Sequence, residues 1–596
     1  MPEHAPSSSQ PYYDLGSFHR PITTASSDCQ AWFDRGLVWA YAFNHDEAAA
    51  CFRHAIAHDP CCPMAHWGLA LALGPNYNKP WGLFDPADLA SSLHGAYVAA
   101  KTAEAHIATA SPVEQALITA IQSRYQAGVP PTPASSPSPS PTPTPTHDAA
   151  GSSNLNTSLQ LATWNEAFAD AMKTVYDDFH DDLDVTTLYA EALINLTPWQ
   201  LWDLKTGAPS PKARTLPAKR ALEAALHSPS SATAASRHPG LLHMYIHLME
   251  MSPHPESALT AADHLRALTP DAGHLRHMPS HIDILVGDYR RAIAANTAAI
   301  AADEKYLTAK GLQNFYTLYR SHDYHSLIYA ALLAGQLSVA TTTAAAMEAS
   351  IPDSLLRVRS PPMADWLESF LAVRAHVLIR FGRWSDIAAL ELPRDQSLYC
   401  VTTATLHYAK GIAAAAQNRI REAEIQQQLF RDAVKRVPHR RLTATNRSVS
   451  VLAVAEAMLT GELAYRKGDM DVAFSSLERA VALDDDLIYG EPWAWMVPTR
   501  HAYAALLLEQ GRVEEAAALY RADLGLDGSV PRARQHPGNV WALHGYHECL
   551  RRLGRTAEAD LVEVQLRIAV AVADVEISSS CFCRVGCPKG CVKSVL

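Results

Sequence analysis

The chain lacks any dense run of lysine or arginine. Its 596 residues carry 50 Lys and Arg against 61 Asp and Glu, for a net charge of -11. A protein that follows a phosphate backbone needs clustered cations, because its affinity comes largely from neutralising phosphates. The composition therefore argues against nucleic acid as a partner.

Long apolar runs are also missing from the sequence. We find no window of about 18 uninterrupted apolar residues, the length that suggests a membrane-spanning helix. The first residues, Met1-Pro-Glu-His, lack the basic stretch and the apolar segment of a secretory signal. We therefore expect a cytoplasmic protein with no membrane partner, whose oligomeric state the sequence does not indicate.

Four further absences bear on the fold and the chemistry. Alternating β-branched runs are rare, so strands are not expected. Glycine-rich phosphate loops, Gly-x-Ser-x-Gly elbows and dinucleotide fingerprints are not found. These absences argue against nucleotide-dependent chemistry.

The ten cysteines do not indicate a disulfide framework. Six are scattered through a long chain that can build its own core, so we expect them to be reduced and mostly buried. The other four crowd the end of the chain as Cys581, Cys583, Cys587 and Cys591. This spacing either holds a soft metal ion or belongs to a flexible tail over residues 576–596.

What remains is a chain rich in alanine and leucine with helical periodicity. Residues 1–25 read as a disordered arm and residues 26–575 as a helical body. Residues 128–153 form a Pro/Ser/Thr-rich insertion, which we expect to be disordered because such a composition cannot build a core.

Short breaks in the helical pattern share one form. Each predicts a helix that ends at a residue able to take positive φ, often glycine, followed by a helix whose small alanine packs closely. The last three glycines, at 468, 511 and 554, are 43 residues apart, which exceeds the usual 34-residue tetratricopeptide unit. The repeats are therefore either degenerate or built from extended helices. The breaks are Asn44–Ala48, Gly287–Ala292, Gly382–Ala388, Gly468–Ala473, Gly511–Ala516 and Gly554–Ala559.

The repeat pattern resembles the tetratricopeptide repeat (TPR), because second helices end in aspartate, as in Phe52–Pro60 and Leu477–Asp484. The chain is also similar to a group of large TPR proteins in bacteria and fungi. The resemblance implies an all-α, TPR-like solenoid of antiparallel helical hairpins, which can close around a central pocket, and it implies no established reaction. It is carried by five segments, Phe43–Ala48, Ala65–Asn78, Leu188–Asn195, His243–Glu250 and His277–His281.

Histidine is concentrated in the middle of the chain, where seven of the 28 lie between positions 243 and 281. His243 and His247 share a helix face with Glu250, at i, i+4 and i+7. His277 and His281 also alternate with apolar residues and should pack inward. We predict that these four histidines hold one transition metal ion (Zn, Fe or Cu), with Glu250 as a ligand or a catalytic base.

The histidines also admit a metal-free interpretation, in which buried imidazoles hydrogen-bond across helix pairs. A zinc-peptidase motif is not supported, because Met244 stands where the catalytic glutamate would follow the first histidine. His325 could add a further base or ligand at the start of a later helix.

Four other polar residues are weak candidates for a substrate pocket: Asn44, His45, Asn76 and Glu191. For the asparagines, helix capping and turn formation are the alternative roles, since Asn readily bonds its own backbone in turns.

Two functions from different classes follow. In the first, the His/Glu site is that of a metal-dependent enzyme acting on a small molecule. In the second, the solenoid is an adaptor that binds a protein or peptide, and the histidines are structural. Polar residues concentrate in one central hairpin, and this favours the enzyme.

Overall fold

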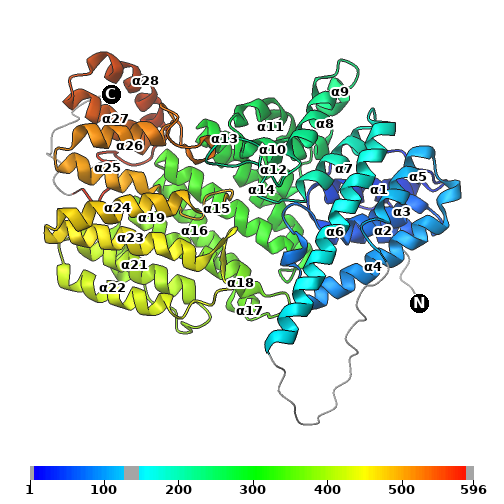
Figure 1. The fold of residues 1–596 in the computed structure, drawn as a ribbon, viewed down its shortest axis with the longest axis horizontal. Coiled ribbons are helices and arrows are strands. Elements are labelled where there is room, and N and C mark those ends of the chain that lie inside the picture. The colour runs from blue at the N-terminus through cyan, green and yellow to red at the C-terminus, as the bar shows by residue number, and fades with distance from the viewer. Residues whose placement is uncertain (1–5, 127–146, 585–596) are drawn as a thin grey trace, which may run out of the picture. The chain divides into compact units, whose positions relative to one another are not determined.

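The computed structural model describes residues 6–126 and 147–584, with side chains of the helix that follows the gap described from Thr157 onward. The chain is built almost entirely of helices (Figure 1). Two compact units are present. Unit 1 comprises residues 1–203, 208–249 and 260–276, and unit 2 comprises residues 204–207, 250–259 and 277–596.

Unit 1 contains the helices from α1 to α12 except η3. Three residues at the ends of these helices belong to unit 2: Glu250 of α10, Leu259 of α11 and His277 of α12. Its helices are α1 (Ser27–Tyr41), α2 (His45–His58), α3 (Pro63–Ala72), η1 (Trp81–Leu83), α4 (Pro86–Ala105), η2 (Ile107–Thr109), α5 (Pro112–Ile121), α6 (His147–Phe179), α7 (Leu183–Ile194), α8 (Thr215–His227), α9 (Ala232–Ala235), α10 (Pro239–Glu250), α11 (Leu259–Leu265) and α12 (Gly273–His277).

Unit 2 contains the later helices and one small strand pair. They are η3 (Pro255–Ala258), α13 (Pro279–Val286), α14 (Tyr289–Lys310), α15 (Tyr316–Ala334), α16 (Leu337–Ser350), α17 (Asp353–Leu356), α18 (Met363–Leu367), η4 (Glu368–Ala372), α19 (Val373–Arg380), α20 (Trp384–Ala389), α21 (Cys400–Ala416), α22 (Ile420–Val434), β1 (Leu442–Thr443), β2 (Asn446–Arg447), α23 (Ser448–Lys467), α24 (Met470–Asp485), α25 (Thr499–Glu509), α26 (Val513–Asp523), η5 (Arg532–Arg534), α27 (Val540–Arg552) and α28 (Thr556–Val572).

The predicted hairpins are confirmed. Gly468, Gly511 and Gly554 take φ of 83°, 75° and 71° and separate α23 from α24, α25 from α26 and α27 from α28. Glycine reaches this left-handed conformation without the steric cost of a side chain. The chain is therefore an all-α, TPR-like array of helical hairpins.

The 43-residue spacing has its origin in the connections between hairpins. α24 and α25 are separated by residues 486–498, and α26 and α27 by residues 524–539. These connections lengthen the repeat, and extended helices do not account for it, since α26 has only 11 residues.

Close packing in unit 1 depends on small residues beneath an aromatic ring. The buried ring of Phe52 on α2 fills the space beside Gly36 on α1 and Gly68 on α3. A Cβ at Gly68 would lie 2.3 Å from Phe52 Cε1, and a Cβ at Gly36 would lie 2.8 Å from it. Both distances are too short for a real contact, so glycine is required for the three helices to meet here.

The described part of the predicted disordered arm is held against unit 1. Trp32 Nε1 donates to the carbonyl of Pro6 at 2.8 Å, and the Arg20 guanidinium is buried between Asp182 and Asp184. Residues 6–25 therefore follow the body closely, because their polar groups find partners there.

The predicted insertion at 128–153 lies partly outside the described residues. Residues 127–146 are not described, and α6 begins at His147. The last residues of the predicted insertion are thus helical.

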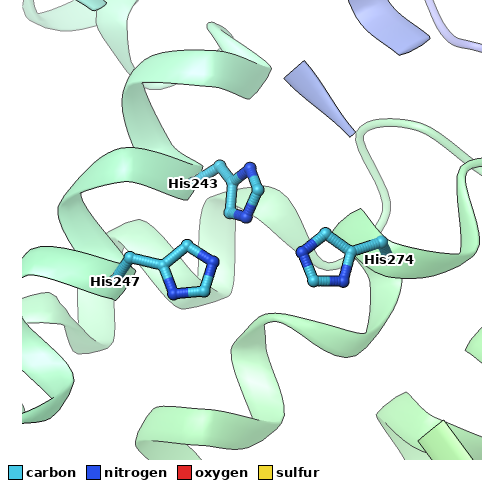
Figure 2. A group of neighbouring side chains, drawn as sticks. All are labelled: His243, His247 and His274. Atoms are coloured by element: carbon cyan, nitrogen blue, oxygen red, sulfur yellow. The ribbon is translucent and has the colours of Figure 1, made fainter. Parts of the chain in front are cut away.

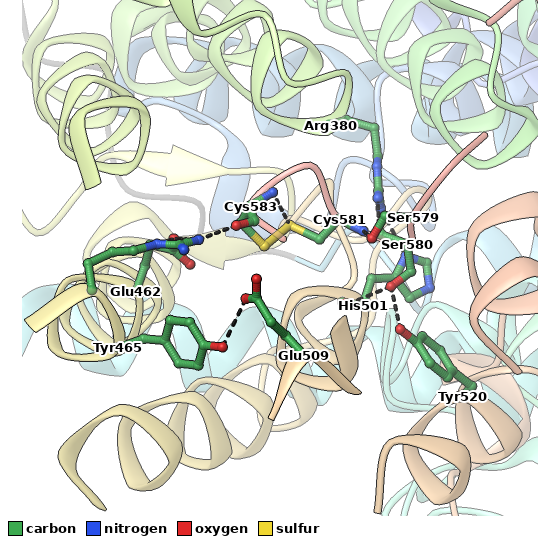
Figure 3. Close-up of a disulfide and its surroundings, with 11 residues drawn as sticks. Arg380, Glu462, Tyr465, His501, Glu509, Tyr520, Ser579, Ser580, Cys581 and Cys583 are labelled. Carbon is green, nitrogen blue, oxygen red and sulfur yellow. Dashed lines mark hydrogen bonds and ion pairs between the residues drawn. A yellow bond between two sulfur atoms is a disulfide. The ribbon is translucent and has the colours of Figure 1, made fainter. Parts of the chain in front are cut away.

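The predicted flexible tail is packed into unit 2 as far as Arg584, and residues 585–596 lie outside the described part of the chain. Cys581 and Cys583 form a disulfide, and Figure 3 shows the residues around it. Arg380 donates to the carbonyl of Ser580, and Ser580 Oγ donates to the carbonyl of His501 at 3.0 Å. The six scattered cysteines form no disulfide within the described residues, and all but Cys61 are buried, as expected.

Two smaller features complete the fold. β1 and β2 pair in an antiparallel hairpin of two residues each, the single sheet within the described residues. α23 is long and apolar enough to cross a membrane by length and composition, and 72% of its most apolar window is buried inside the protein. Such burial is typical of a core helix.

Candidate histidine-rich metal sites

A cluster of three imidazoles lies in the interior of unit 1. His243 and His247 come from consecutive turns of α10, and His274 comes from α12. One ring nitrogen from each residue lies within 4.8 Å of the others, and all three residues are fully buried. Figure 2 shows the three rings facing one another. We call this group the α10–α12 cluster.

The orientation of His243 is fixed from α1. Its Nδ1 lies 2.6 Å from the carbonyl oxygen of Tyr41, which can only accept, so Nδ1 carries the proton and Nε2 carries the lone pair. The Tyr41 hydroxyl donates to Asp184 Oδ1 at 2.6 Å. Burial alone would raise the pKa of Asp184, but the neighbouring charges of His238 and Arg20 outweigh it and hold that pKa well below its usual range. A buried ionic network therefore supports the element that orients His243.

Phe43 forms an aromatic wall beside the α10–α12 cluster. Its ring centroid lies 4.5 Å from that of His243, and the ring stacks on His247 and His274 at 5.8 Å and 5.6 Å. Phe43 takes φ of 55°, a left-handed conformation that costs a non-glycine residue about 1–2 kcal/mol. The fold holds a strained, buried residue at this position.

A second cluster lies in unit 2 and is built from three further imidazoles. His277 ends α12, His281 lies in the first turn of α13, and His322 lies on α15. His277 Nε2 is 2.6 Å from His281 Nε2 and 2.9 Å from His322 Nε2. His277 and His281 are buried, and His322 is partly exposed. We call this group the α13–α15 cluster.

The outer nitrogen of His277 faces a side-chain acceptor. Its Nδ1 lies 2.5 Å from Asn296 Oδ1, and the other amide atom, Asn296 Nδ2, donates to the carbonyl of Ala292 at 2.9 Å. That second bond identifies Oδ1 as the atom facing His277, so His277 Nδ1 is the donor. Asp323 Oδ1 also lies 3.3 Å from the same nitrogen.

The outer nitrogen of His281 faces a carboxylate. His281 Nδ1 bonds Glu250 Oε2, and Glu250 in turn shares a hydrogen bond with Glu491. Burial raises the pKa of both Glu250 and Glu491 well above the ordinary value, but their mutual hydrogen bond lowers the pKa of Glu250 and raises that of Glu491. The proton of that hydrogen bond is therefore assigned to Glu491, which leaves Glu250 as the acceptor facing His281.

The four predicted metal ligands fall into these two clusters. His243 and His247 lie with His274 in unit 1, and His277 and His281 lie with His322 in unit 2. His274 and His322 are not among the predicted ligands. The i, i+3, i+7 spacing would place His274 on one helix face with His277 and His281, whereas in the structure it joins His243 and His247. His322 reaches His277 only through the packing of α15.

The two predicted catalytic residues, Glu250 and His325, lie outside the three-histidine groups. Glu250 lies behind His281, where it orients the ring. His325 packs edge-on against Phe370 with ring centroids 5.2 Å apart, and burial, followed by the nearby His376, lowers the pKa of His325 to about 3. At neutral pH His325 is thus an uncharged residue of the core.

The weak pocket candidates carry local structural roles. Asn44 caps α2 by accepting from the amide of Glu47 at 3.2 Å, and Asn76 Oδ1 accepts from the amide of Lys79 at 2.8 Å. His45 Nδ1 lies 3.1 Å from the carbonyl of Gly74. Burial raises the pKa of Glu191 to about 7. Capping and turn formation therefore account for the two asparagines.

Comparisons with known proteins add the following. No protein-family model matches the chain, and no curated protein is similar to it. Among solved structures, the chain has some similarity to the APC/C hetero-tetramer Cut9–Hcn1, with a TM-score of 0.29 and 12% identity over 88% of this chain and 76% of that one. For Naa15/Naa10 bound to HypK-THB the TM-score is 0.21 and the identity 14%, over 90% of this chain and 70% of that one. For yeast Tom70 the TM-score is 0.28 and the identity 12%, over 91% of this chain and 90% of that one. Scores this low carry no conclusion about function, and the TPR-like description rests on the hairpins themselves.

Proposed function

We propose that this protein binds one transition metal ion through His277, His281 and His322 and uses the ion to act on a small molecule. The convergence of three Nε2 atoms at 2.6 Å and 2.9 Å is the observation that carries the proposal.

The protonation of the rings supports a metal ion at this point. Because His277 and His281 donate their Nδ1 protons outward, their Nε2 lone pairs point at each other. Two lone pairs at 2.6 Å repel unless a proton or a cation lies between them. A cation accepts all the lone pairs together, and outer acceptors on the ligating rings are typical of metal-binding histidines.

The composition of the cluster favours chemistry over a purely structural ion. Three protein nitrogens leave a coordination position for water or substrate, as in catalytic zinc sites. His322 is partly exposed, so this side of the cluster is the more accessible one. An ion there would polarise a substrate or lower the pKa of bound water. Zn would direct the chemistry to hydrolysis, and Fe or Cu to oxidation.

The test is the metal content of untagged protein, measured by elemental mass spectrometry for the natural chain and for His322→Ala. His254→Ala is the matched control, because that side chain is 73% exposed. We expect His322→Ala to lose one ion per chain while its circular dichroism and the control stay unchanged. Full metal content in His322→Ala, or a natural chain that stays metal-free after incubation with Zn, Fe(II) and Cu, would overturn the proposal.

A protein-binding scaffold is the second candidate function, and the surface of α28 favours it. Leu561, Val564 and Ile568 lie at i, i+3 and i+7 and are 74%, 61% and 66% exposed. An exposed apolar stripe of this kind leaves hydrophobic surface that another apolar surface can cover. Such a stripe suits the apolar face of a partner helix.

The scaffold is tested with the variant Leu561→Ser/Ile568→Ser, with Val472→Ser on α24 as the control for an exposed apolar residue elsewhere. We expect a partner that co-purifies with the natural chain and the control to be lost from the stripe variant. Equal recovery with all three chains would remove the stripe as a binding surface.

A further inference from the structure

We propose that the α10–α12 cluster is a second metal site, separate in its ligands from the proposed catalytic one, which holds a Zn or Cu ion in an enclosed and slowly exchanging position. The proposal goes beyond the function above, since it concerns different residues in a different unit.

The first argument is the convergence of three imidazole nitrogens in a buried position. His243, His247 and His274 are each 0% exposed, and one nitrogen of each lies within 4.8 Å of the others. Imidazole nitrogens are common ligands of Zn and Cu, and three of them at this separation can bind one ion together.

The second argument is the fixed tautomer of His243. Its Nδ1 proton is committed to the Tyr41 carbonyl, so Nε2 is presented as an acceptor of a cation or a proton. Carbonyl oxygens are common outer partners of metal-binding histidines, which they hold in one ring orientation. The Tyr41 carbonyl at the end of α1 therefore accepts a hydrogen bond from the outer nitrogen of His243, as Asn296 and Glu250 do for the rings of the α13–α15 cluster.

The third argument is the aromatic enclosure. Phe43 stacks on two of the rings, and the buried ring of Tyr77 lies 4.7 Å from that of His247. Tyr77 is itself held in place, because its hydroxyl accepts from the amide of Trp199 at 3.0 Å. The fold keeps Phe43 in a left-handed conformation to complete this wall. Walls of this kind exclude water and slow the exit of an ion.

The ligand chemistry narrows the choice of ion. Three neutral imidazoles suit borderline metals such as Zn and Cu, whereas Mg and Ca prefer oxygen ligands. Zn and Cu share this chemistry, and elemental analysis distinguishes them directly.

The experiment compares four chains by elemental mass spectrometry after reconstitution with Zn or Cu and removal of excess ion: the natural chain, His274→Ala, His322→Ala and the double variant. We expect two ions per chain, one in each single variant and none in the double variant. Brief exposure to a chelator should strip His274→Ala, which retains the accessible site, before it strips His322→Ala, which retains the enclosed one.

The outcomes separate this proposal from the one before it. A His274→Ala chain that keeps every ion overturns the second site, whereas loss confined to His322→Ala leaves the proposed function standing. If His274→Ala misfolds by circular dichroism, the conservative variant His247→Gln replaces it. Retention of both ions by folded His247→Gln would likewise overturn the proposal.

Discussion

The two histidine clusters differ in what holds the outer nitrogen of their rings. In the α10–α12 cluster the outer partner of His243 is a neutral backbone carbonyl, that of Tyr41. In the α13–α15 cluster the partners of His281 and His277 are side chains, Glu250 and Asn296. A carboxylate makes the ring it contacts a stronger electron donor than a carbonyl does, so similar ligands can serve ions with different tasks.

The clusters also differ in their access to solvent. Every ring of the α10–α12 cluster is fully buried, whereas His322 of the α13–α15 cluster is partly exposed. A buried site favours retention of an ion, and a partly exposed one allows a substrate to approach. We therefore propose retention of an ion for the buried cluster and chemistry for the partly exposed one.

The largest effect should come from the ionic network beneath the α10–α12 cluster. We expect Asp184→Asn to lower the free energy of unfolding by about 3 kcal/mol, because it leaves the buried Arg20 and His238 without their shared carboxylate. Urea unfolding at pH 7 measures the change. Asp181→Asn is the control, since that side chain is 99% exposed, and an equal loss in both variants would contradict the network's role.

The same network predicts a pH dependence. The pKa of Asp184 is depressed in the folded protein, by charges and hydrogen bonds that outweigh burial, so its stabilising contribution is present above its unfolded pKa of about 3.9. This contribution is lost as the pH falls below that value toward the folded pKa. The gap between the natural chain and Asp184→Asn should therefore shrink from pH 4 downward, and a constant gap at all pH values would be inconsistent with the mechanism.

A smaller effect is expected from the outer partner of His277. Asn296→Leu keeps the volume of the side chain but removes the acceptor, and this should weaken ion binding at the α13–α15 cluster by roughly 10–100-fold. Competition with a coloured chelator measures the affinity. Ion binding at the α10–α12 cluster should not change, because Asn296 contacts only the α13–α15 cluster. An effect confined to one cluster would show that the two bind ions independently.

Two variants control the Asn296 prediction. Thr297→Ala changes the next, exposed residue of α14 and should leave the affinity unchanged. Asn296→Asp retains an acceptor oxygen and should bind more tightly than Asn296→Leu. If Asn296→Asp binds as weakly as Asn296→Leu, packing rather than hydrogen bonding determines the affinity.

The hairpins could be predicted because their determinants are local. Gly468, Gly511 and Gly554 each take a positive φ that ends one helix, and the next helix begins shortly after. In the structure each turn lies at the predicted glycine. The packing of residues 6–25 and 576–584 was not foreseen, because partners such as Asp184 and Arg380 lie far away in the chain.

The sequence predicts the candidate sites only where their residues lie on one helix. His243 and His247 share a face of α10, which periodicity alone indicates. His322 joins His277 only because α15 packs beside α14, which in turn packs beside α13. Phe43 reaches the imidazoles through an unusual φ. Neither of these two approaches follows from the spacing of residues along the chain. The sequence therefore predicts one shared site, whereas the structure places the four histidines in two clusters.

The smallest expected effect concerns the aromatic wall. Phe43→Leu preserves apolar volume and should cost about 1 kcal/mol of stability, but it removes the ring that stacks on His247 and His274. Since an aromatic contact is worth about 0.5–1.5 kcal/mol, we expect the ion of the α10–α12 cluster to leave up to roughly tenfold faster in chelator. The ion of the α13–α15 cluster is the internal control, because Phe43 belongs to unit 1 and its loss should leave that release rate unchanged. Equal acceleration of both ions would show that the variant loosens the whole chain, and the enclosure of the first cluster would then have to come from other residues.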